Sequence, residues 1–410
     1  MFDMFDFLRG KLFLTRMVML ASAAGLTTIG ILMIYASGNP YDSSASLGGI
    51  TDIWKKQAIY AAAGFIGLIF LNSFSYKKLG PASGWLYFGI IVLLAVLILD
   101  IFIDLPFVPL KKGSRRWILF GSLFQFQPSE FFKLVYIIAL GWHLRYRSNY
   151  RNLSSLLPPF LLTIFPMALI FLEPDLGTVL LMMPVFLSML FLAGARVKHL
   201  VIIISIAILG LPVLWLNMHD YQRMRVSSVL LQSKIDGSDN WLKQKSIEKP
   251  WLAKLLGVSA ERLRTWEAGE GYHLTRSKLA IASGGLSGQG FRSGPFVKYG
   301  KFLPEKHNDF IFAFISHQWG FAGAMLLVGL YALLIACGME ISAASTDTFG
   351  SYVAAGISII FAIQVLVNIG MNIGLMPITG ITLPFISYGG SSLLVNIFAV
   401  GLVNNIGRTK

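Results

Sequence analysis

Charged residues and cysteines are both scarce in this chain. Lysine, arginine, aspartate and glutamate make up 13% of its 410 residues, whereas hydrophobic residues make up 55% and the mean hydropathy is +0.67. A soluble domain could not hide that much apolar surface from water, so the composition favours an integral membrane protein. The single cysteine, Cys337, excludes an internal disulfide and a cysteine-rich metal site.

Apolar runs of about 20 residues, the length that crosses the hydrocarbon core of a bilayer, recur along the whole chain. They predict ten transmembrane helices at 15–37, 57–74, 81–103, 128–145, 156–172, 176–194, 199–216, 309–338, 350–373 and 390–407. The first run is long and has no small-residue cleavage site after it, so we expect a helix rather than a signal peptide. The expected fold class is an all-α integral membrane protein, with residues 1–410 forming a single transmembrane domain.

An even number of spans places both termini on the same side of the membrane. Lysine and arginine number twelve in the tails and short loops on the N-terminal side and six in the short loops opposite, which predicts that both termini are cytoplasmic. The 217–308 loop between helices 7 and 8 is then extracytoplasmic, and it is the one large non-membrane segment expected.

Two segments of the 217–308 loop have distinct patterns. Residues 250–268 place tryptophans and leucines at helical spacing, with charged residues between them. This spacing predicts an amphipathic helix that lies at the membrane interface or against a partner. Residues 283–294 are too rich in glycine for a helix, and form either a linker or a backbone that approaches an anion closely.

The net charge of +14 has two interpretations. Basic residues on the cytoplasmic side are expected of a membrane protein, because they face anionic lipid. Basic residues in the outer loops, beside apolar helices, instead suit a lipid-linked anion such as a pyrophosphate. Nucleic acid is a poor alternative, because no soluble basic domain is present to bind it.

A charged residue at the centre of a transmembrane helix costs about 2.5–3.5 kcal/mol, so each one needs an explanation. The fourth span begins QPSEFFK, in which Glu130 and Lys133 lie on one helical face and can pair. The pair is either structural or faces a polar substrate cavity. The preceding segment GSRRW adds Arg115 and Arg116 at the outer end of the same helix.

Two further acidic clusters lie at the outer ends of spans. Asp175 is predicted to cap the helix that follows it, and the role of Glu173 is left open. Asp309 ends the long loop in the segment FLPEKHNDFIFA, at the outer mouth of span eight. Either Asp309 or Asn308 is an N-cap, or Asp309 is a general base toward a sugar hydroxyl, and spacing alone does not separate these alternatives.

Prolines and glycines interrupt the apolar pattern between residues 368 and 392. They predict a broken or re-entrant segment at 374–390, which at membrane depth must be buried in protein or line a cavity. Gly389, Gly390 and Ser391 then open the last span, where a helix N-terminus could bind an anion. A loop packed against its neighbours is the alternative.

Together these motifs resemble the SEDS family (shape, elongation, division, sporulation), the RodA/FtsW/SpoVE polymerases of bacterial cell-wall peptidoglycan. The segment NIGMNIGLMPITGITLPFISYGGSS fits the family signature, and GSRRW, QPSEFFK, EPDLGT, GYHLTRSKLAIASGG and FLPEKHNDFIFA extend the resemblance over nearly the whole chain. DYQRMRV and GYHLTRSKLAIASGG are similar to the RodA branch, which serves elongation and cell shape. One departure is Ser316-His317-Gln318-Trp319, where relatives usually carry acidic residues.

The resemblance implies a glycosyltransferase of the bacterial inner membrane that polymerises lipid II on the extracytoplasmic face. Asp309 matches the essential aspartate, the base that deprotonates the 4-hydroxyl of the acceptor GlcNAc, and undecaprenyl diphosphate is the leaving group. Glu130 and Lys133 match the functional pair of the fourth span. The other candidates for substrate binding are Lys111, Lys112, Arg115, Arg116, Arg223, Arg225, Ser387, Gly389, Gly390 and Ser391. Of these, Arg115 and Arg116 are preferred, because a planar guanidinium suits phosphate.

The resemblance also implies partners. They are lipid II, undecaprenyl diphosphate, a class B penicillin-binding protein that crosslinks the new strand, and other membrane proteins of the elongation complex; no nucleic acid is expected. A divalent cation, Mg²⁺ or Mn²⁺, could assist the leaving group, but the sequence contains no evident ligand set.

Other functions fit parts of the pattern. A transporter that flips lipid II would explain ten helices, an intramembrane Glu130/Lys133 pair and a broken segment, although no inverted repeat is visible. A structural scaffold for the crosslinking partner leaves the outer carboxylates and arginines unexplained. Within the family, a division polymerase of the FtsW type is the alternative.

Overall fold

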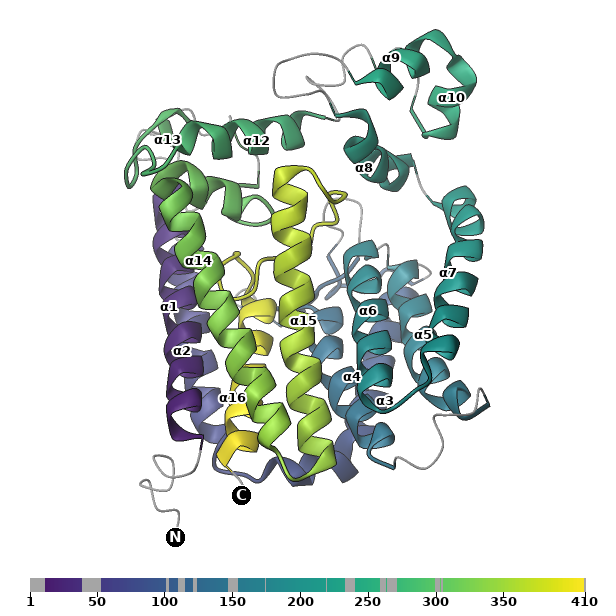
Figure 1. Cartoon of the computed structure of the whole chain (residues 1–410), viewed down its shortest axis with the longest axis vertical. Coiled ribbons are helices and arrows are strands. Elements are labelled where there is room, and N and C mark those ends of the chain that lie inside the picture. Colours follow the sequence, from purple (N-terminus) through teal and green to yellow (C-terminus); the bar gives the residue numbers. More distant parts are fainter. Residues whose placement is uncertain are drawn as a thin grey trace.

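Helices account for most of the protein. The computed structural model describes residues 12–38, 53–100, 103–109, 115–120, 124–146, 154–173, 175–218, 220–232, 240–258, 263, 271–298, 303 and 305–408. A helix covers each of the ten predicted spans (Figure 1): α1 (Phe13–Ser37), α2 (Ile53–Leu71), α3 (Leu79–Leu99), α4 (Pro128–Leu144), α5 (Leu157–Leu172), α6 (Leu176–Leu192), α7 (Val197–Asn217), α14 (Ile311–Ala344), α15 (Thr348–Ile373) and α16 (Gly390–Arg408). α1 begins and α16 ends at the same end of the bundle.

The apolar length of these helices identifies a multi-pass membrane protein. Among the described residues, six helical segments are long and apolar enough to span a membrane: α1, α3 with the short helix η3 (Tyr76–Lys78) before it, α7, α14, α15 and α16. α5 and α6 are apolar but shorter, and α2 and α4 carry charged residues. The predicted all-α membrane fold is confirmed, whereas the number of membrane crossings stays a prediction.

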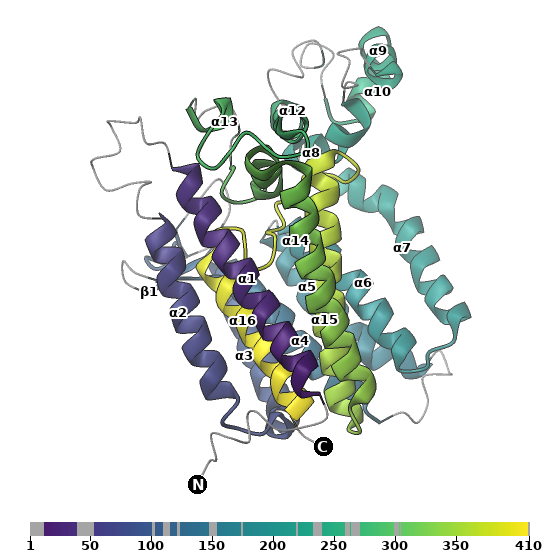
Figure 2. The same ribbon diagram turned by 60° about the vertical axis from the view of Figure 1, so that its left-hand side comes forward.

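α15 is a central helix of the bundle, and α14, α6 and α4 pack around it (Figures 1 and 2). Small residues allow this packing: a Cβ on Gly356 would lie 2.7 Å from Ile137 and 2.9 Å from Met189. α7 differs, because only 17% of its apolar window is buried and it lies at the edge of the bundle beside α6. Most of the α7 surface is therefore available to lipid.

Polar side chains are hydrogen-bonded to one another at the end of the bundle where α1 begins. We call this group the inner polar network; its members are Arg16, Asn72, Asn404, Asn405 and Arg408. Arg16 Nε donates to Asn404 Oδ1 (3.0 Å), and Asn404 Nδ2 donates to Asn72 Oδ1 (2.8 Å). Arg408 Nη1 donates to the Asn72 carbonyl (2.9 Å). The network therefore joins α1, the end of α2 and α16. Arg16 itself is fully buried within it.

A short β-hairpin, which the sequence did not indicate, lies between α3 and α4. Its strands β1 (Ile118–Phe120) and β2 (Phe124–Phe126) are antiparallel. Ser391, at the start of α16, donates its hydroxyl to the Gln125 carbonyl (2.9 Å) and accepts a hydrogen bond from the Gln127 amide (3.1 Å). The hairpin is thereby attached to the last helix, and it fixes the outer end of α4 beside α16.

The long loop contains several helices: α8 (Asp220–Leu231), α9 (Trp241–Glu248), α10 (Pro250–Leu255), α12 (Tyr272–Gly284) and α13 (Pro295–Lys298). The prediction of one continuous helix over 250–268 is wrong. α10 ends at Leu255, and Gly257 has φ 72°, which a right-handed helix does not contain. Leu256 and Leu263 instead contribute to a small apolar cluster with Leu231; residues 259–262 and 264–270 lie outside the described residues.

α14 is broken at Gly320, where φ is 64° and ψ is −160°. The predicted span at 309–338 is therefore two helical segments, and the second continues to Ala344. We call residues 311–319 the outer segment of α14. The glycine-rich residues that follow α12 lie against this break, since Gln289 N donates to the His317 carbonyl (3.0 Å) and Phe321 N donates to the Gly285 carbonyl (2.8 Å). The 283–294 segment is thus neither a free linker nor wholly non-helical: α12 includes its first two residues, and its backbone approaches α14.

Candidate active site

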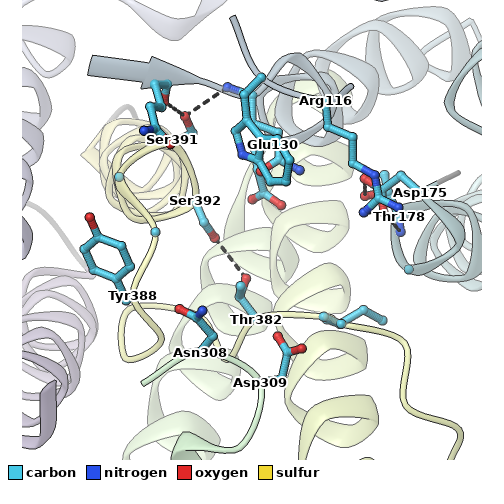
Figure 3. Close-up of a pocket in the computed structure, with 18 of the residues that line it drawn as sticks. Arg116, Glu130, Asp175, Thr178, Asn308, Asp309, Thr382, Tyr388, Ser391 and Ser392 are labelled. Carbon is cyan, nitrogen blue, oxygen red and sulfur yellow. Dashed lines mark hydrogen bonds and ion pairs between the residues drawn. The ribbon is translucent and has the colours of Figure 1, made fainter. Parts of the chain in front are cut away.

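A cavity of about 590 Å³ lies among the outer ends of α2, α4, α6 and α16 and the segment that precedes α14 (Figure 3). Charged and polar side chains line much of it, with glycines between them. The lining includes Lys56, Tyr60, Arg116, Gln127, Glu130, Lys133, Asp175, Gly177, Thr178, Glu305, Asn308, Asp309, Gly380, Thr382, Tyr388, Gly389, Gly390, Ser391 and Ser392. A large cavity with converging charged groups is the default candidate for an active site.

Three helices begin at this cavity: α4 at Pro128, α6 at Leu176 and α16 at Gly390. The N-terminus of a helix carries a partial positive charge and presents N–H groups that the helix itself does not use. The three ends together therefore favour an anion in the cavity. The motif at 389–392 indicated this property only for α16, because the convergence depends on the fold.

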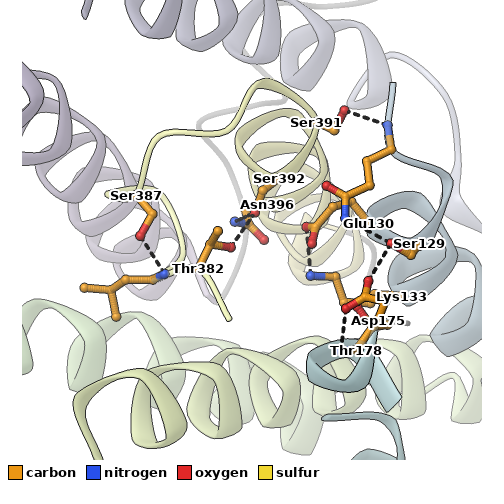
Figure 4. Close-up of polar contacts among 12 residues, drawn as sticks. Ser129, Glu130, Lys133, Asp175, Thr178, Thr382, Ser387, Ser391, Ser392 and Asn396 are labelled. Atoms are coloured by element: carbon orange, nitrogen blue, oxygen red, sulfur yellow. Dashed lines mark hydrogen bonds and ion pairs between the residues drawn. The ribbon is translucent and has the colours of Figure 1, made fainter. Parts of the chain in front are cut away.

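Glu130 and Lys133 form an ion pair on the cavity wall (Figure 4), with Lys133 Nζ 2.8 Å from Glu130 Oε2. The pairing predicted from their spacing is confirmed. The Lys133 side chain is 5% exposed and the Glu130 side chain 10%, so both charges are largely removed from water, yet both residues line the cavity. A bound anion can therefore compete with Glu130 for the Lys133 ammonium.

Arg116 lines the same cavity. Its Nε donates to the Glu173 carbonyl (2.9 Å), and its Nη1 lies 3.7 Å from Asp175 Oδ1. Asp175 caps α6, as predicted: its carboxylate accepts hydrogen bonds from Thr178 N (3.4 Å) and Thr178 Oγ1 (2.9 Å). Ser129 Oγ also donates to Asp175, at 3.0 Å (Figure 4). These contacts fix the guanidinium of Arg116 between the starts of α4 and α6.

Two other predicted arginines lie elsewhere. Arg115 is not among the described residues that line the cavity, and its guanidinium forms ion pairs of 2.8 Å with Asp100 and with Asp104. Arg223 donates to two carbonyls in the last turn of α7, those of Trp215 (3.0 Å) and Leu216 (2.8 Å). The structure therefore places neither arginine at the cavity, and their contact with the substrate stays a prediction. Lys111, Lys112 and the side chain of Arg225 lie outside the described residues.

Glu173 is buried behind Arg116, with a relative exposure of 3%. Within the described part of the chain, neither of its carboxylate oxygens has a hydrogen-bond partner. Burial, followed by the nearby charge of Asp175, raises the pKa of Glu173 to about 9, although Arg116 opposes this shift. Its side chain is therefore a neutral carboxylic acid at neutral pH.

Asp309 lies at the edge of the cavity, and Figure 3 shows its carboxylate directed toward Thr382. The backbone carbonyl of Asp309 accepts hydrogen bonds from Asn368 Nδ2 (3.2 Å) and Asn372 Nδ2 (3.0 Å), both on α15. The N-cap of α14 is Phe310, and no side chain caps this described helix end. The N-cap alternative for Asp309 and Asn308 is therefore wrong.

The segment between α15 and α16 forms the wall opposite α4. α15 ends at Ile373, Gly374 adopts a left-handed conformation (φ 86°), and no helix is present among these residues before α16 begins. Ser387 is 4% exposed and does not line the cavity; its hydroxyl donates to the Asn308 carbonyl (2.8 Å) and accepts from Leu383 N (2.8 Å). Ser387 thus supports the backbone beside Asp309, whereas Gly389, Gly390 and Ser391 do reach the cavity.

Several cavity residues were missed by the sequence motifs. Lys56 contributed only to the prediction of membrane orientation. Gln127 marked only the start of the fourth span, and Glu305 was only part of a motif. Glu305 accepts a hydrogen bond from Asn308 Nδ2 (2.7 Å). The available signal was their position at the outer ends of predicted spans, which does not indicate which side chains face inward.

The family profile described as "Cell cycle protein", for FtsW, RodA and SpoVE, matches residues 16–245 and 252–410. The chain belongs to this family. One relative of this FtsW/RodA/SpoVE protein is peptidoglycan glycosyltransferase RodA of Treponema pallidum, 31% identical over 430 residues, with 95% of this chain and 96% of the relative covered. Another is stage V sporulation protein E of Bacillus subtilis, 33% identical over 393 residues, with 93% and 94% covered.

The FtsW/RodA/SpoVE fold is also that of solved structures. One chain of a peptidoglycan synthase complex, described as coordinating polymerization and crosslinking, superposes with a TM-score of 0.69 at 26% identity, and 95% of this chain and 96% of that chain are covered. The identities to the RodA and sporulation relatives are nearly equal, so identity alone does not assign this family member to a branch.

Proposed function

We propose that this chain, a peptidoglycan glycosyltransferase of the FtsW/RodA/SpoVE family, polymerises lipid II in the cavity described above, with Asp309 as the general base. The observation that carries the proposal is that the Asp309 carboxylate shares one cavity with Arg116, Lys133 and three helix N-termini. The transfer needs a base for a sugar hydroxyl and a positively charged site for a diphosphate.

In the proposed reaction, Asp309 accepts the proton of the 4-hydroxyl of the acceptor GlcNAc. The hydroxyl oxygen attacks C1 of the lipid-linked MurNAc, the bond from C1 to the diphosphate oxygen breaks, and undecaprenyl diphosphate leaves with the electron pair of that bond. Negative charge develops on the diphosphate during this step. The guanidinium fork of Arg116, the ammonium of Lys133 and the positive N-terminal ends of α4, α6 and α16 stabilise that charge.

A divalent cation, Mg²⁺ or Mn²⁺, remains a proposal. The part of the chain that the structure describes holds no group of three or more histidine, cysteine, aspartate or glutamate side chains arranged for a metal ion. Of the cavity carboxylates, Glu130 is paired with Lys133 and Asp175 caps α6. These residues do not form a protein cage for a cation, and they fit only an ion held mainly by substrate phosphates, as Mg²⁺ often is. Such an ion would neutralise phosphate charge.

The proposed setting is the bacterial inner membrane, with both termini cytoplasmic and the cavity on the extracytoplasmic face, as the lysine and arginine bias predicts. A crosslinking transpeptidase, a class B penicillin-binding protein, is the proposed partner, together with other membrane proteins of the elongation complex. The likeness to one chain of a complex that couples polymerization and crosslinking supports this partner. The motifs at 220–226 and 271–285 support a role in elongation and cell shape.

The substitution Asp309→Asn tests the proposed base. Asparagine has nearly the same shape but cannot accept the proton, so we expect the polymerisation rate of purified protein with lipid II to fall by about 10²–10⁴-fold. The Tm in detergent should change little, because asparagine keeps the size of the side chain and the backbone carbonyl at this position still accepts from Asn368 and Asn372. Glycan products are measured on a gel.

The matched control is Asp347→Asn, the same chemical change at the N-cap of α15, at the other end of the bundle. Because asparagine is also a good N-cap, this variant should keep full activity. Full activity in Asp309→Asn would remove Asp309 as the base. Movement of lipid II across liposomes by a protein that makes no glycan strands would instead favour a transporter.

A further inference from the structure

The break in α14 is joined to the long loop by backbone hydrogen bonds on both sides of Gly320. On the outer side, Gln289 N donates to the His317 carbonyl and Gly290 N to the Gln318 carbonyl, each at 3.0 Å. On the inner side, Phe321 N donates to the Gly285 carbonyl (2.8 Å) and Ala322 N to the Leu286 carbonyl (3.1 Å). We call residues 283–294 and 316–322 the joint. The loop thereby supplies the partners that a helix break would leave unpaired.

The glycines of the joint are required by contact distance. A Cβ on Gly284 would lie 1.9 Å from the Ser316 carbonyl oxygen, and one on Gly288 would lie 2.1 Å from the Gln318 carbonyl oxygen. Real side chains cannot occupy such positions, so the loop and the helix meet backbone to backbone. This contact restricts the angle between the two segments of α14.

Two side chains of the outer segment of α14 also bond to the loop part of the joint. His317 is fully buried, and its Nδ1 lies 2.7 Å from Ser283 Oγ. The Ser283 hydroxyl has one proton and donates it to the Ala280 carbonyl (2.7 Å), so we assign the Nδ1–H tautomer to His317, with Ser283 as the acceptor. Gln318 Nε2 adds a hydrogen bond to the Ser293 carbonyl (2.9 Å).

The joint is connected to the proposed base through the outer segment of α14. This segment begins two residues after Asp309 and ends at the joint. At its start, Ala313 N donates to Asn372 Oδ1 (3.2 Å), and Asn372 Nδ2 donates to the Asp309 carbonyl (3.0 Å). α12 contacts the end of the segment directly, through Ser283 and His317, and its start indirectly, because Ser277 Oγ donates to the carbonyl of Asn372 (2.8 Å). A change at the joint therefore tilts the segment that leads to Asp309.

We propose that His317 and Ser283 are positioning residues, which set the angle of the outer segment of α14 and thereby hold Asp309 at the reacting distance from the acceptor hydroxyl. The inference rests on the proposed role of Asp309 as the base. It gives a function to the Ser316-His317-Gln318 run. Arg116 and Lys133 lie on other elements. The joint therefore sets the position of the base and leaves the position of the anion site unchanged.

Steady-state kinetics of purified full-length protein with lipid II test this inference. His317→Leu removes the donor to Ser283, and Ser283→Ala removes the acceptor. We expect each to lower kcat by about 10- to 100-fold, because a displacement of about 1 Å at a reacting group has an effect of this size. KM should change by less than about 2-fold, since the residues that bind the diphosphate do not move.

Three further variants separate positioning from a general structural role. His317→Asn keeps an N–H donor near the Nδ1 position and should recover most of kcat. The double variant His317→Leu/Ser283→Ala should be no slower than the slower single variant, because both remove one interaction. Ser358→Ala removes a buried hydroxyl on α15, whose Oγ donates to Ala354 (2.8 Å), and should leave kcat unchanged.

The outcomes are distinct. Loss of kcat at nearly constant KM, with recovery in His317→Asn, supports the inference. Normal kcat in folded His317→Leu and Ser283→Ala, together with an inactive Asp309→Asn, would overturn it while leaving the base in place. A rise in KM without a fall in kcat would also overturn it. An active Asp309→Asn would instead overturn the proposed function.

Discussion

Buried polar side chains occur at both ends of the helix bundle, but the groups around them differ. In the inner polar network, the side-chain amides and arginines bond to one another and to backbone carbonyls. At the outer end, carboxylates and cations from α4, the segment preceding α14 and the residues before the hairpin line a cavity of about 590 Å³. A satisfied network of polar groups holds helices together. Charges beside open space are costly in a membrane protein, and they are retained where a substrate uses them.

Variants of the Glu130–Lys133 pair should show the largest effects on stability and polymerisation, and so distinguish the two ends most clearly. Lys133→Met leaves Glu130 buried without its cation, which should cost about 3–5 kcal/mol of stability and abolish polymerisation. The double variant Glu130→Gln/Lys133→Met removes both charges, so we expect its Tm to recover while its activity does not. Thermal unfolding and glycan gels measure the two quantities. Recovered activity in the double variant would make the pair purely structural, like the inner polar network.

The adjacent arginines give the next largest effect. Arg116→Gln removes a charge from the cavity and should lower kcat/KM for lipid II by about 10- to 100-fold, the size expected for one charge-assisted hydrogen bond. Arg115→Gln is the matched control, because Arg115 pairs with aspartates outside the cavity lining, and it should keep nearly full kcat/KM. Equal losses in the two variants would refute the assignment of Arg116 alone to the anion site.

A third effect should appear in stability only. Arg16→Met removes the donor to Asn404 and leaves that amide oxygen unpaired, at a cost of about 1–3 kcal/mol. The kcat of the folded protein should not change, because the inner polar network lies at the opposite end of the bundle from the cavity. Denaturation in detergent and kinetics on the folded fraction check both expectations. A specific fall in kcat would show that the two ends are coupled.

The smallest effect on polymerisation is expected from Glu173→Gln. The folded pKa of Glu173, about 9, lies above its ordinary value of 4.5, so folding favours the protonated acid. The stability that this group contributes is fully present below pH 4.5 and is lost as the pH rises toward 9. The glutamine variant cannot ionise, so its Tm should fall less than that of the parent between these pH values. Parallel Tm profiles would mean that Glu173 is solvated.

The positions of the helices were largely predictable, because each span has its own local signal. Span six was predicted at 176–194 and α6 covers Leu176–Leu192, since apolar length and the Asp175 cap both mark its start. The Glu130–Lys133 pair was predictable for the same reason, as helical spacing determines which residues share a face.

The arrangement of the site depends on contacts between distant residues. Arg115 and Arg116 are adjacent in non-helical backbone, where successive side chains point in opposite directions, so only one of them reaches the cavity. The glycines at 284–294 suggested flexibility, but their lack of side chains serves the contact with α14. No local pattern could reveal that contact, because its partner lies some thirty residues further along the chain.

α4, α6 and α16 all point the same way, and their far ends have a consequence of their own. Arg145 is the C-cap residue of α4, and Arg408 lies in the last turn of α16. These arginines belong to the set that predicts cytoplasmic termini, and each lies where a helix carries its partial negative charge. α4 and α16 are therefore parallel dipoles, with an arginine of the chain at the negative end of each. At the positive end of α4 the chain supplies Glu130, whereas α16 has no acidic residue in its first turn, so a bound anion would complete the charge pairing there.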